Sequence, residues 1–344
     1  MAKLSTLSDE YTALLRERPI CIVDVGARGG LQAHWSRIRE HCVFVGFEPE
    51  IAEAKRLQSQ AKPNELYLPS ALDGEVRTAT LHHCVKPTRS SLYPPDPEVI
   101  ADLYGTAEPY RVSRTESIQV TTLDSLLVSK SLPDPDFIKL DTQGSELDIL
   151  KGARTALASS LLGVESEVEF IRLYKDQPLF EDVSAFLRQQ GFDLIGFRSW
   201  TRRVDIRFDY RGEMGYKHVL EFASAWAARK IPPRGAATGM SQVVYGDALF
   251  IRQPARYLEW IESSGEDPLT GVLKAVVLAT ELRLYEYALR LSDAATQSAL
   301  IERRHRESLS RYVSARSRDL RPMVHRARAT AQRLVRRLKN PGRR

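Results

Sequence analysis

The stretch Cys21-Ile-Val-Asp-Val-Gly-Ala-Arg-Gly-Gly30 decides the fold of this chain. Its first half is an apolar, largely β-branched run with the length of a buried parallel strand. The glycines at positions 26, 29 and 30 then allow a tight turn and let the backbone approach a ligand closely. We therefore predict a central strand that ends in a glycine turn, followed by a helix from about residue 31.

A second apolar run, 42–47, ends at Glu48. A strand, a glycine turn, a helix and a second strand with a terminal acid are typical of a nucleoside pocket, in which the carboxylate binds the ribose hydroxyls. The turn lacks the three glycines in fixed register that a dinucleotide site needs. The pattern Asp24-x-Gly26-x-x-Gly29 instead suits a ligand with no phosphate and a positive centre, such as S-adenosylmethionine. The alternative is a turn that only packs helix on sheet, with Glu48 in solvent.

The order of elements predicts an α/β fold. Strands at 20–25, 42–47 and 66–72 alternate with helices, which is typical of a doubly wound, mostly parallel, Rossmann-like sheet. The stretch 75–120 breaks this rhythm with two strand-like segments and a Pro-rich loop, so we expect an antiparallel insertion at the carboxyl edge of the sheet. Later strands are expected at 163–170, 192–197 and 242–251. The predicted boundaries are an N-terminal helix (1–18), a main domain (19–253) and a helical extension (254–344).

A second landmark is Asp136-Phe-Ile-Lys-Leu-Asp-Thr-Gln-Gly-Ser-Glu146, an apolar strand that ends on Asp141. Asp141 is a candidate general base, or a ligand of a divalent cation that would acidify a hydroxyl group. Its alternative role is to cap the helix that begins near Ser145. Glu167 is the second catalytic candidate, because a buried carboxylate on a central strand needs a partner or a task. On an edge strand, Glu167 and its neighbouring glutamates would simply be solvated.

Five motifs occur along the chain in a specific order: VDVGARGG at 23–30, GFEP at 46–49, SSL at 90–92, TTLD at 121–124 and IKLDTQGSE at 138–146. In this order the chain resembles FkbM-type methyltransferases from about residue 19 to residue 252. The resemblance implies a class I methyltransferase fold and an S-adenosylmethionine-dependent enzyme that methylates hydroxyl groups of sugars, glycans or secondary metabolites. The chain departs from the family at Arg28, where Asn is common, and at Thr142-Gln143, which replaces the commoner Val-Glu.

Pattern and resemblance together define three sets of site residues. Arg28 either meets the carboxylate of the cofactor or only covers the site. The acceptor residues lie on the Pro-rich loop, which is preordered; the alternative is a surface loop with no contact. The predicted sets are Asp24, Gly26, Arg28, Gly29, Glu48, Ala71 and Leu72 for the cofactor, Ser90, Ser91 and Tyr93 for the acceptor, and Asp141 and Glu167 for catalysis.

The net charge of +6 hides an asymmetry. Residues 303–344 carry 15 Lys and Arg against two acids, whereas residues 1–302 carry 35 against 42. Within 318–339, apolar residues recur every three to four positions between arginines, which predicts a helix that contacts an anionic membrane or an acidic partner. The alternative is a solvated amphipathic helix or a coiled-coil arm. Nucleic acid is disfavoured, because no aromatic residues lie among the arginines to stack on bases.

The remaining composition predicts a cytoplasmic protein. Cys21, Cys42 and Cys84 show no paired spacing, so we expect buried free thiols in a reducing compartment. No signal sequence and no membrane-spanning apolar run are visible. We expect the basic helix to bring the enzyme to a lipid-linked glycan at the inner membrane face, and the apolar stretch 270–300 to pack on the main domain or on a second copy.

Two rival functions use the same features. A catalytically silent member could use the cofactor fold to assemble glycan enzymes, but such a protein would not need Asp24, Glu48 and Asp141 together. A nucleic-acid methyltransferase would explain the high isoelectric point. It would carry an Asn/Asp-Pro-Pro-aromatic loop after the fourth strand, where this chain has Asp141-Thr-Gln-Gly.

Overall fold

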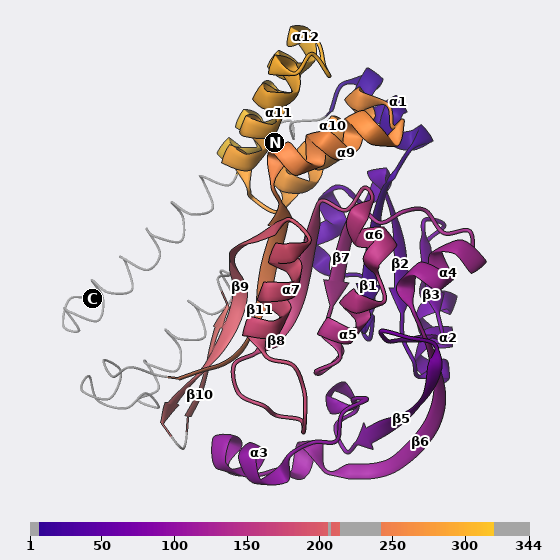
Figure 1. The fold of residues 1–344 in the computed structure, drawn as a ribbon, viewed down its shortest axis with the longest axis vertical. Helices are drawn as coiled ribbons and strands as arrows, with labels where there is room; N and C mark the ends of the chain where they lie inside the picture. The colour runs from indigo at the N-terminus through magenta and orange to yellow at the C-terminus, as the bar shows by residue number, and fades with distance from the viewer. Residues whose placement is uncertain (1–6, 206–207, 214–241, 320–344) are drawn as a thin grey trace, which may run out of the picture. The chain divides into compact units, whose positions relative to one another are not determined.

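The computed structural model describes residues 7–205, 208–213 and 242–319 (Figure 1). The chain divides into two compact units. The larger comprises Ile20–Trp260, and the smaller combines Met1–Pro19 with Ile261–Arg344. The helix before Pro19 therefore belongs to the same unit as the C-terminal helices.

The larger unit is built on one twisted sheet. Within the described residues this sheet has eight strands in the order β10-β9-β11-β8-β7-β1-β2-β3. The strands from β3 to β8 run parallel, and β11 is antiparallel to both of its neighbours. The predicted doubly wound, mostly parallel sheet is confirmed. The strands are β1 (Ile20–Val25), β2 (Cys42–Phe47), β3 (Glu65–Leu68), β7 (Phe137–Leu140), β8 (Gly163–Glu169), β9 (Phe192–Asp205), β10 (Phe208–Glu213) and β11 (Gln242–Arg252).

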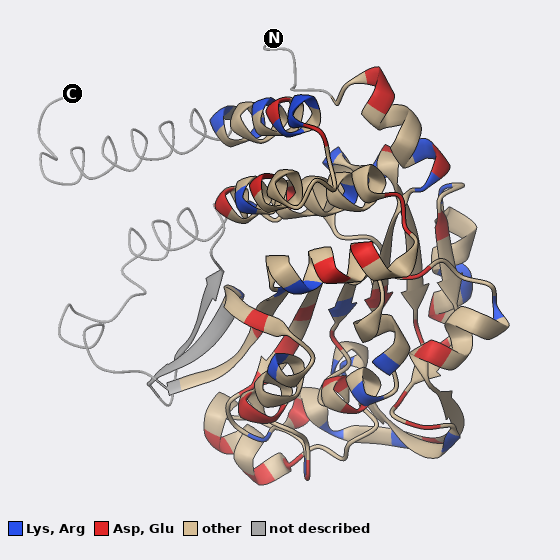
Figure 2. Cartoon of the chain, turned by 45° about the horizontal axis from the view of Figure 1, so that its top comes forward, with Lys and Arg blue, Asp and Glu red and all other residues tan. Residues whose placement is uncertain are grey.

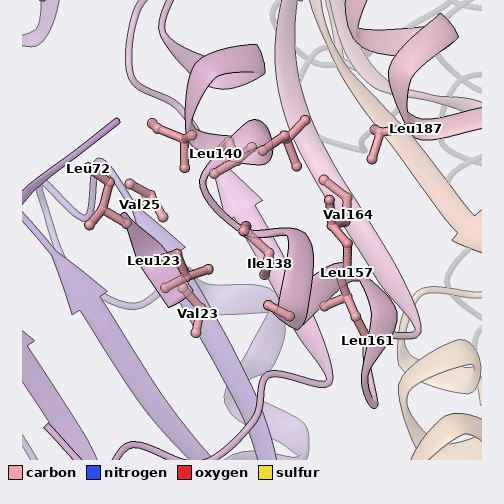
Figure 3. Packing of buried hydrophobic residues seen from close by; sticks show 14 of the residues in the cluster. Val23, Val25, Leu72, Leu123, Ile138, Leu140, Leu157, Leu161, Val164 and Leu187 are labelled. Atoms are coloured by element: carbon pink, nitrogen blue, oxygen red, sulfur yellow. The ribbon is translucent and has the colours of Figure 1, made fainter. Parts of the chain in front are cut away.

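Helices cover both faces of this sheet. On one face, the helices α4 (Leu123–Ser129), α5 (Glu146–Lys151), α6 (Arg154–Ala158) and α7 (Phe180–Gln189) bury their apolar side chains against β1, β7 and β8 (Figure 3). On the other face, Trp35 packs edge-on against Phe137, with ring centroids 5.2 Å apart. Helix α2 (Ile51–Gln60) covers Tyr67 of β3 there through Leu57. Each fully buried Leu or Val contributes roughly 1.5–3 kcal/mol to stability.

Two predicted elements differ from the structure. The helix expected from residue 31 is a pair of 3₁₀ helices, η1 (Ala33–Arg37) and η2 (Arg39–His41). Its buried side chains, Trp35 and Ile38, are three residues apart, which suits the three-residue turn of a 3₁₀ helix. The strand expected at 66–72 divides at Pro69, because proline has no N–H for the ladder. Its second part, β4 (Ala71–Leu72), joins another sheet.

The predicted antiparallel insertion is this second sheet. In the described chain it has three strands in the order β4-β6-β5, and β5 (Arg77–Cys84) is antiparallel to β6 (Val112–Thr121). Between β5 and β6 lie η3 (Pro87–Arg89), α3 (Pro97–Tyr104) and η4 (Glu108–Tyr110). The N–H of Asp96 donates to the carbonyl of Leu173 at 2.9 Å, which ties the insertion to the segment after β8.

The smaller unit is helical. Its helices are α1 (Asp9–Glu17), α10 (Pro268–Glu281), α11 (Tyr285–Gln297) and α12 (Arg303–Asp319), and α9 (Pro254–Ser264) begins in the larger unit. The hydroxyl of Tyr11 lies 3.2 Å from Nδ1 of His305, so α1 is held against α12. Helix α12 carries several arginines, which are blue in Figure 2. The predicted basic helix at 318–339 lies almost entirely outside the described residues.

Two sequence expectations concern the whole chain. The three cysteines are free and buried, as predicted. Among the helices that the structure describes, none combines the length and apolar character needed to cross a membrane.

Candidate active site

A cavity of about 460 Å³ opens at the carboxyl ends of β1, β2 and β7. The chain leaves β1 toward β2 on one side and later returns to β7 on the other, so this is the switch point at which open α/β sheets bind ligands. The glycine turn lies at one end of the cavity and the insertion forms the opposite wall. Its lining includes Gly26, Arg28, Phe47, Glu48, Ala71, Leu72, Lys86, Arg89, Ser90, Ser91, Asp141, Gln143, Glu167, Tyr245 and Asp247.

The glycine turn is fixed to the next strand. The N–H groups of Gly26 and Ala27 both donate to the carbonyl of Phe47, at 3.0 and 3.1 Å. Gly26 has φ of 82°, and a Cβ there would lie 2.0 Å from the carbonyl oxygen of Asp141. Only glycine fits, and the close approach brings the turn beside the end of β7.

Glu48 is buried at 3% exposure, so the alternative that placed it in solvent is wrong. Its Oε1 accepts the N–H of Glu50 at 3.0 Å and lies 3.5 Å from the Arg28 guanidinium. Burial raises the pKa of Glu48, and the Glu50 N–H and Arg28 oppose that rise. Arg28 also pairs with Glu50, which holds its guanidinium over the cavity beside Glu48.

Two predicted cofactor residues do not line the cavity. Asp24 is not among the lining residues, and its Oδ1 lies 3.8 Å from Nζ of Lys139. Burial raises the pKa of Asp24, and Lys139 opposes the rise. The N–H of Gly29 donates to Glu53 at 3.4 Å. Ala71 and Leu72 do line the cavity, as β4 runs along its edge.

Asp141 lines the cavity with its side chain 40% exposed. Burial acts to raise its pKa, but Nζ of Lys139 at 3.3 Å and Nε2 of Gln143 at 3.2 Å outweigh it, so the pKa is lowered. The helix-cap alternative is wrong, because Ser145 occupies the N-cap position of α5. Glu146 instead accepts the N–H groups of Thr142 and Gly144, at 2.7 and 2.9 Å, and fixes the loop.

Glu167 is one of three glutamates buried on β8. This strand lies between β7 and β11, so the edge-strand alternative is wrong. Burial raises the pKa of Glu167 well above its usual range, and the carboxylates of Asp141 and Glu169 raise it further. The pKa values of the two groups are therefore shifted in opposite directions, and Asp141 ionises at a lower pH than Glu167. Two neighbouring carboxyl groups with separated pKa values are the arrangement typical of an acid and base pair.

Gln143 connects these groups and was not among the predicted site residues. Its Oε1 accepts hydrogen bonds from Arg89 at 3.1 Å and from the Tyr174 hydroxyl at 3.0 Å. Its Nε2 donates to Asp141 at 3.2 Å and to Glu167 at 2.5 Å. The one sequence signal was its place in the family motif, where the commoner residue is Glu. Asp247 of β11 was also missed, because the antiparallel pairing with β8 brings it to the cavity.

Two of the three predicted acceptor residues line the cavity. Ser90 and Ser91 line the cavity, and the Ser91 hydroxyl donates to the carbonyl of Gln143 at 2.7 Å. Tyr93 does not line it; its hydroxyl donates to Asp148 at 2.6 Å. For the predicted divalent cation, no group of three or more His, Cys, Asp or Glu side chains in the described ranges is arranged to hold a metal ion.

Comparisons with known proteins identify one matching family and several similar structures. Residues 24–194, about half of the chain, match the family model for the methyltransferase FkbM domain. No curated protein matches the chain. The crystal structure of methyltransferase FkbM from Methylobacillus flagellatus KT is similar at 14% identity and a TM-score of 0.37, over 70% of this chain and 47% of that one. Precorrin-6y C5,15-methyltransferase from Geobacter metallireducens GS-15 is similar at 11% identity and a TM-score of 0.29, over 73% and 93%. This chain thus spans about half the length of the Methylobacillus protein.

Proposed function

The chain belongs to the FkbM methyltransferase family, and from that premise we propose that it methylates a hydroxyl group of a sugar, glycan or secondary metabolite with S-adenosylmethionine. One observation carries the proposal. A single cavity joins the buried Glu48 at the glycine turn to the Asp141–Glu167 pair at the ends of the neighbouring strands. A nucleoside can bind at the first end and a hydroxyl group can lose its proton at the second.

The residues at the glycine-turn end fit the cofactor. Both contacts of Glu48 within the described chain use Oε1, so Oε2 is the atom that we expect the ribose hydroxyls to reach. Phe47 and Leu72 supply apolar surface beside it for the adenine ring. When bound, S-adenosylmethionine supplies a methyl group that its positively charged sulfur has already activated. The protein then has to position the acceptor and remove one proton.

Asp141 is the group that accepts this proton. Its lowered pKa keeps it ionised at neutral pH and it lines the cavity, whereas the raised pKa of Glu167 favours the protonated form of that group. Gln143 holds both carboxyl groups through Nε2, and its own orientation is set by Arg89 and Tyr174. The acceptor hydroxyl therefore meets a carboxylate whose direction is fixed before the acceptor binds.

Calorimetry with S-adenosylhomocysteine tests the cofactor site. We expect the wild type to bind it and Glu48→Gln to bind at least about tenfold more weakly, because hydrogen bonds to a charged group are lost. Glu40→Gln is the matched control, since Glu40 is 81% exposed and lies outside the cavity. If the wild type does not bind S-adenosylhomocysteine, the proposed function is wrong.

The acceptor can be sought by deleting the gene. Glycans and small metabolites of the deletion strain should then include a species that lacks one methyl group, and adding back the wild-type gene should restore that group. An unchanged methylation profile would count against the acceptor classes named here.

A further inference from the structure

The insertion wall of the cavity is basic. The stretch from Leu81 to Leu92, from which that wall is formed, contains Lys and Arg but no Asp or Glu. Lys86 and Arg89 from this stretch line the cavity, together with the hydroxyl-bearing residues 88, 90 and 91. The facing wall, at the ends of the strands, carries Asp141, Glu167 and Asp247. A molecule in this cavity therefore meets both the cations and the carboxylate that we propose as the proton acceptor.

Neither cation forms an ion pair within the described part of the protein. Among the described residues, no carboxylate oxygen of an Asp or Glu lies within 4.0 Å of a side-chain nitrogen of Lys86 or Arg89. Arg89 is half-buried, with its guanidinium 5.2 Å from the centre of the Tyr110 ring. Its hydrogen bond goes to Oε1 of Gln143, a neutral amide, at 3.1 Å. A partly desolvated guanidinium that is not paired with a carboxylate binds an anion favourably, because the anion supplies a counter-charge at hydrogen-bond distance.

The position of Arg89 assigns this anion to the acceptor. Arg28, at the glycine turn, is the cation beside Glu48, and it already pairs with Glu48 and Glu50. Arg89 instead shares Gln143 with Asp141 and Glu167, at the end of the cavity where the hydroxyl proton is accepted. An anion held at Arg89 would therefore belong to the molecule that presents the hydroxyl group.

We infer that Arg89 and Lys86 bind a carboxylate or phosphate group of the methyl acceptor, so that the acceptor is an acidic molecule and not a neutral one. This inference rests on the proposed function, since it describes the acceptor side of the same site. The anionic group would lie against the insertion wall and turn a hydroxyl group of the same molecule toward Asp141.

Matched probes that differ by one charged group test the inference. Calorimetry of the full chain, saturated with S-adenosylhomocysteine, would compare glucuronate with its methyl ester and glucose 6-phosphate with glucose. We expect the acidic member of at least one pair to bind about tenfold or more tightly than its neutral partner. Added salt should weaken the acidic probe more than the neutral one.

Three variants test whether Arg89 and Lys86 cause this preference for the acidic probe. Arg89→Gln and Lys86→Gln should each remove most of the preference, and Gln143→Glu should reduce it by giving Arg89 a carboxylate partner. Lys86 is exposed, so its replacement leaves the packing intact. Arg111→Gln is the control, because Arg111 is an exposed base of the same insertion that does not line the cavity. It should keep the preference.

Several outcomes would overturn the inference. These are equal binding of acidic and neutral probes by the wild type, no binding of either acid, or a preference that persists in both Arg89→Gln and Lys86→Gln. A matching loss of S-adenosylhomocysteine affinity in these variants would assign the anion to the cofactor. Repeating the titrations without S-adenosylhomocysteine separates this test from the proposed function, since the anion site can fail or hold whether or not the cofactor analogue binds.

Discussion

Asp141 follows β7 and Glu167 lies on the neighbouring β8, yet their environments shift their pKa values in opposite directions. Lys139 and Gln143 place positive or donating groups on Asp141. Glu167 has the same amide donor but lies deeper, among further carboxyl groups, so burial dominates its pKa. The two groups interact and titrate as a pair, and Asp141, the member with the lowered pKa, is the more exposed of the two.

Replacing Asp141 with Asn removes the proposed proton acceptor and leaves the shape of the site almost unchanged. We expect methyl transfer to fall about 10²–10⁴-fold, the usual contribution of a general base. The affinity for S-adenosylhomocysteine should change by less than a few-fold. Transfer of labelled methyl groups to extracts of the deletion strain gives the first quantity and calorimetry gives the second. Asp134→Asn, in an exposed loop, is the control.

The lowered pKa of Asp141 also predicts the pH below which the rate of methyl transfer falls. Its ordinary value is 3.8, and Lys139 holds it lower in the folded protein. Protonation of Asp141 should therefore reduce the wild-type rate only below about pH 4. An acid limb near neutral pH that Asp141→Asn abolishes would show that Asp141 is not ionised as the geometry indicates.

Glu165 offers a separate test of buried charge. Burial raises its pKa from 4.5 to about 7, although Arg198 at 3.2 Å opposes the rise. Between pH 4.5 and about pH 7, Glu165 keeps a proton in the folded protein that it has released in the unfolded chain. The free energy of unfolding therefore falls as pH rises, by about 1.4 kcal/mol per pH unit. Glu165→Gln should remove this component. Urea unfolding of both proteins from pH 5 to pH 8 measures it, and parallel pH dependences would refute it.

At the scale of elements, Asp124 shows why a motif residue outside the cavity matters. It lies in the first turn of α4, yet its carboxylate accepts the N–H groups of Thr155 and Ala156 in α6, at 2.8 and 3.0 Å. The N-cap residue of α6, Ala153, makes no side-chain cap bond. Asp124 thus caps a helix other than its own and links two of the helices that cover the sheet.

Asp124→Ala leaves two N–H groups at the start of α6 without this acceptor. We expect a loss of about 1–2 kcal/mol in the free energy of unfolding, the size of a lost N-cap, with little effect on S-adenosylhomocysteine affinity. Chemical denaturation measures the loss, with Asp134→Ala as the control. A change in cofactor affinity without a change in stability would place Asp124 in the site instead.

The elements that local pattern defines could be predicted, and those that depend on partners could not. The apolar run of β1 and the acid after β2 are readable along the chain, so Glu48 and Asp141 were found at strand ends. The 3₁₀ helices at 33–41 were missed because the pattern of a short amphipathic helix does not distinguish three residues per turn from 3.6. Gln143 and Arg89 were missed because their roles arise where the insertion meets the β7 loop, a contact between distant segments.

At the scale of the molecule, the structure places the first part of the basic tail on a folded helix. Helix α12 packs in the smaller unit through Leu309, Tyr312 and Val313, and the buried Arg316 of this helix pairs with Glu281 at 2.6 Å. Several of the bases after residue 302 therefore lie on a helix that is part of a folded unit. Residues 320–344, which the structure does not describe, hold nine Lys and Arg and no acid. The proposed contact with an anionic membrane accordingly rests on this last segment.

Co-sedimentation with vesicles tests that proposal with a truncation that keeps every described helix. The full chain should bind vesicles that contain anionic lipid, and a chain ending at Asp319 should bind at least tenfold more weakly, because each base near such a surface contributes about 1 kcal/mol. Neutral vesicles and high salt should release the full chain. Equal binding by both chains that salt does not change would assign the contact to the folded units. If neither chain binds, the methyl acceptor need not be lipid-linked, and the acidic acceptor inferred from Arg89 and Lys86 would then be sought among free molecules.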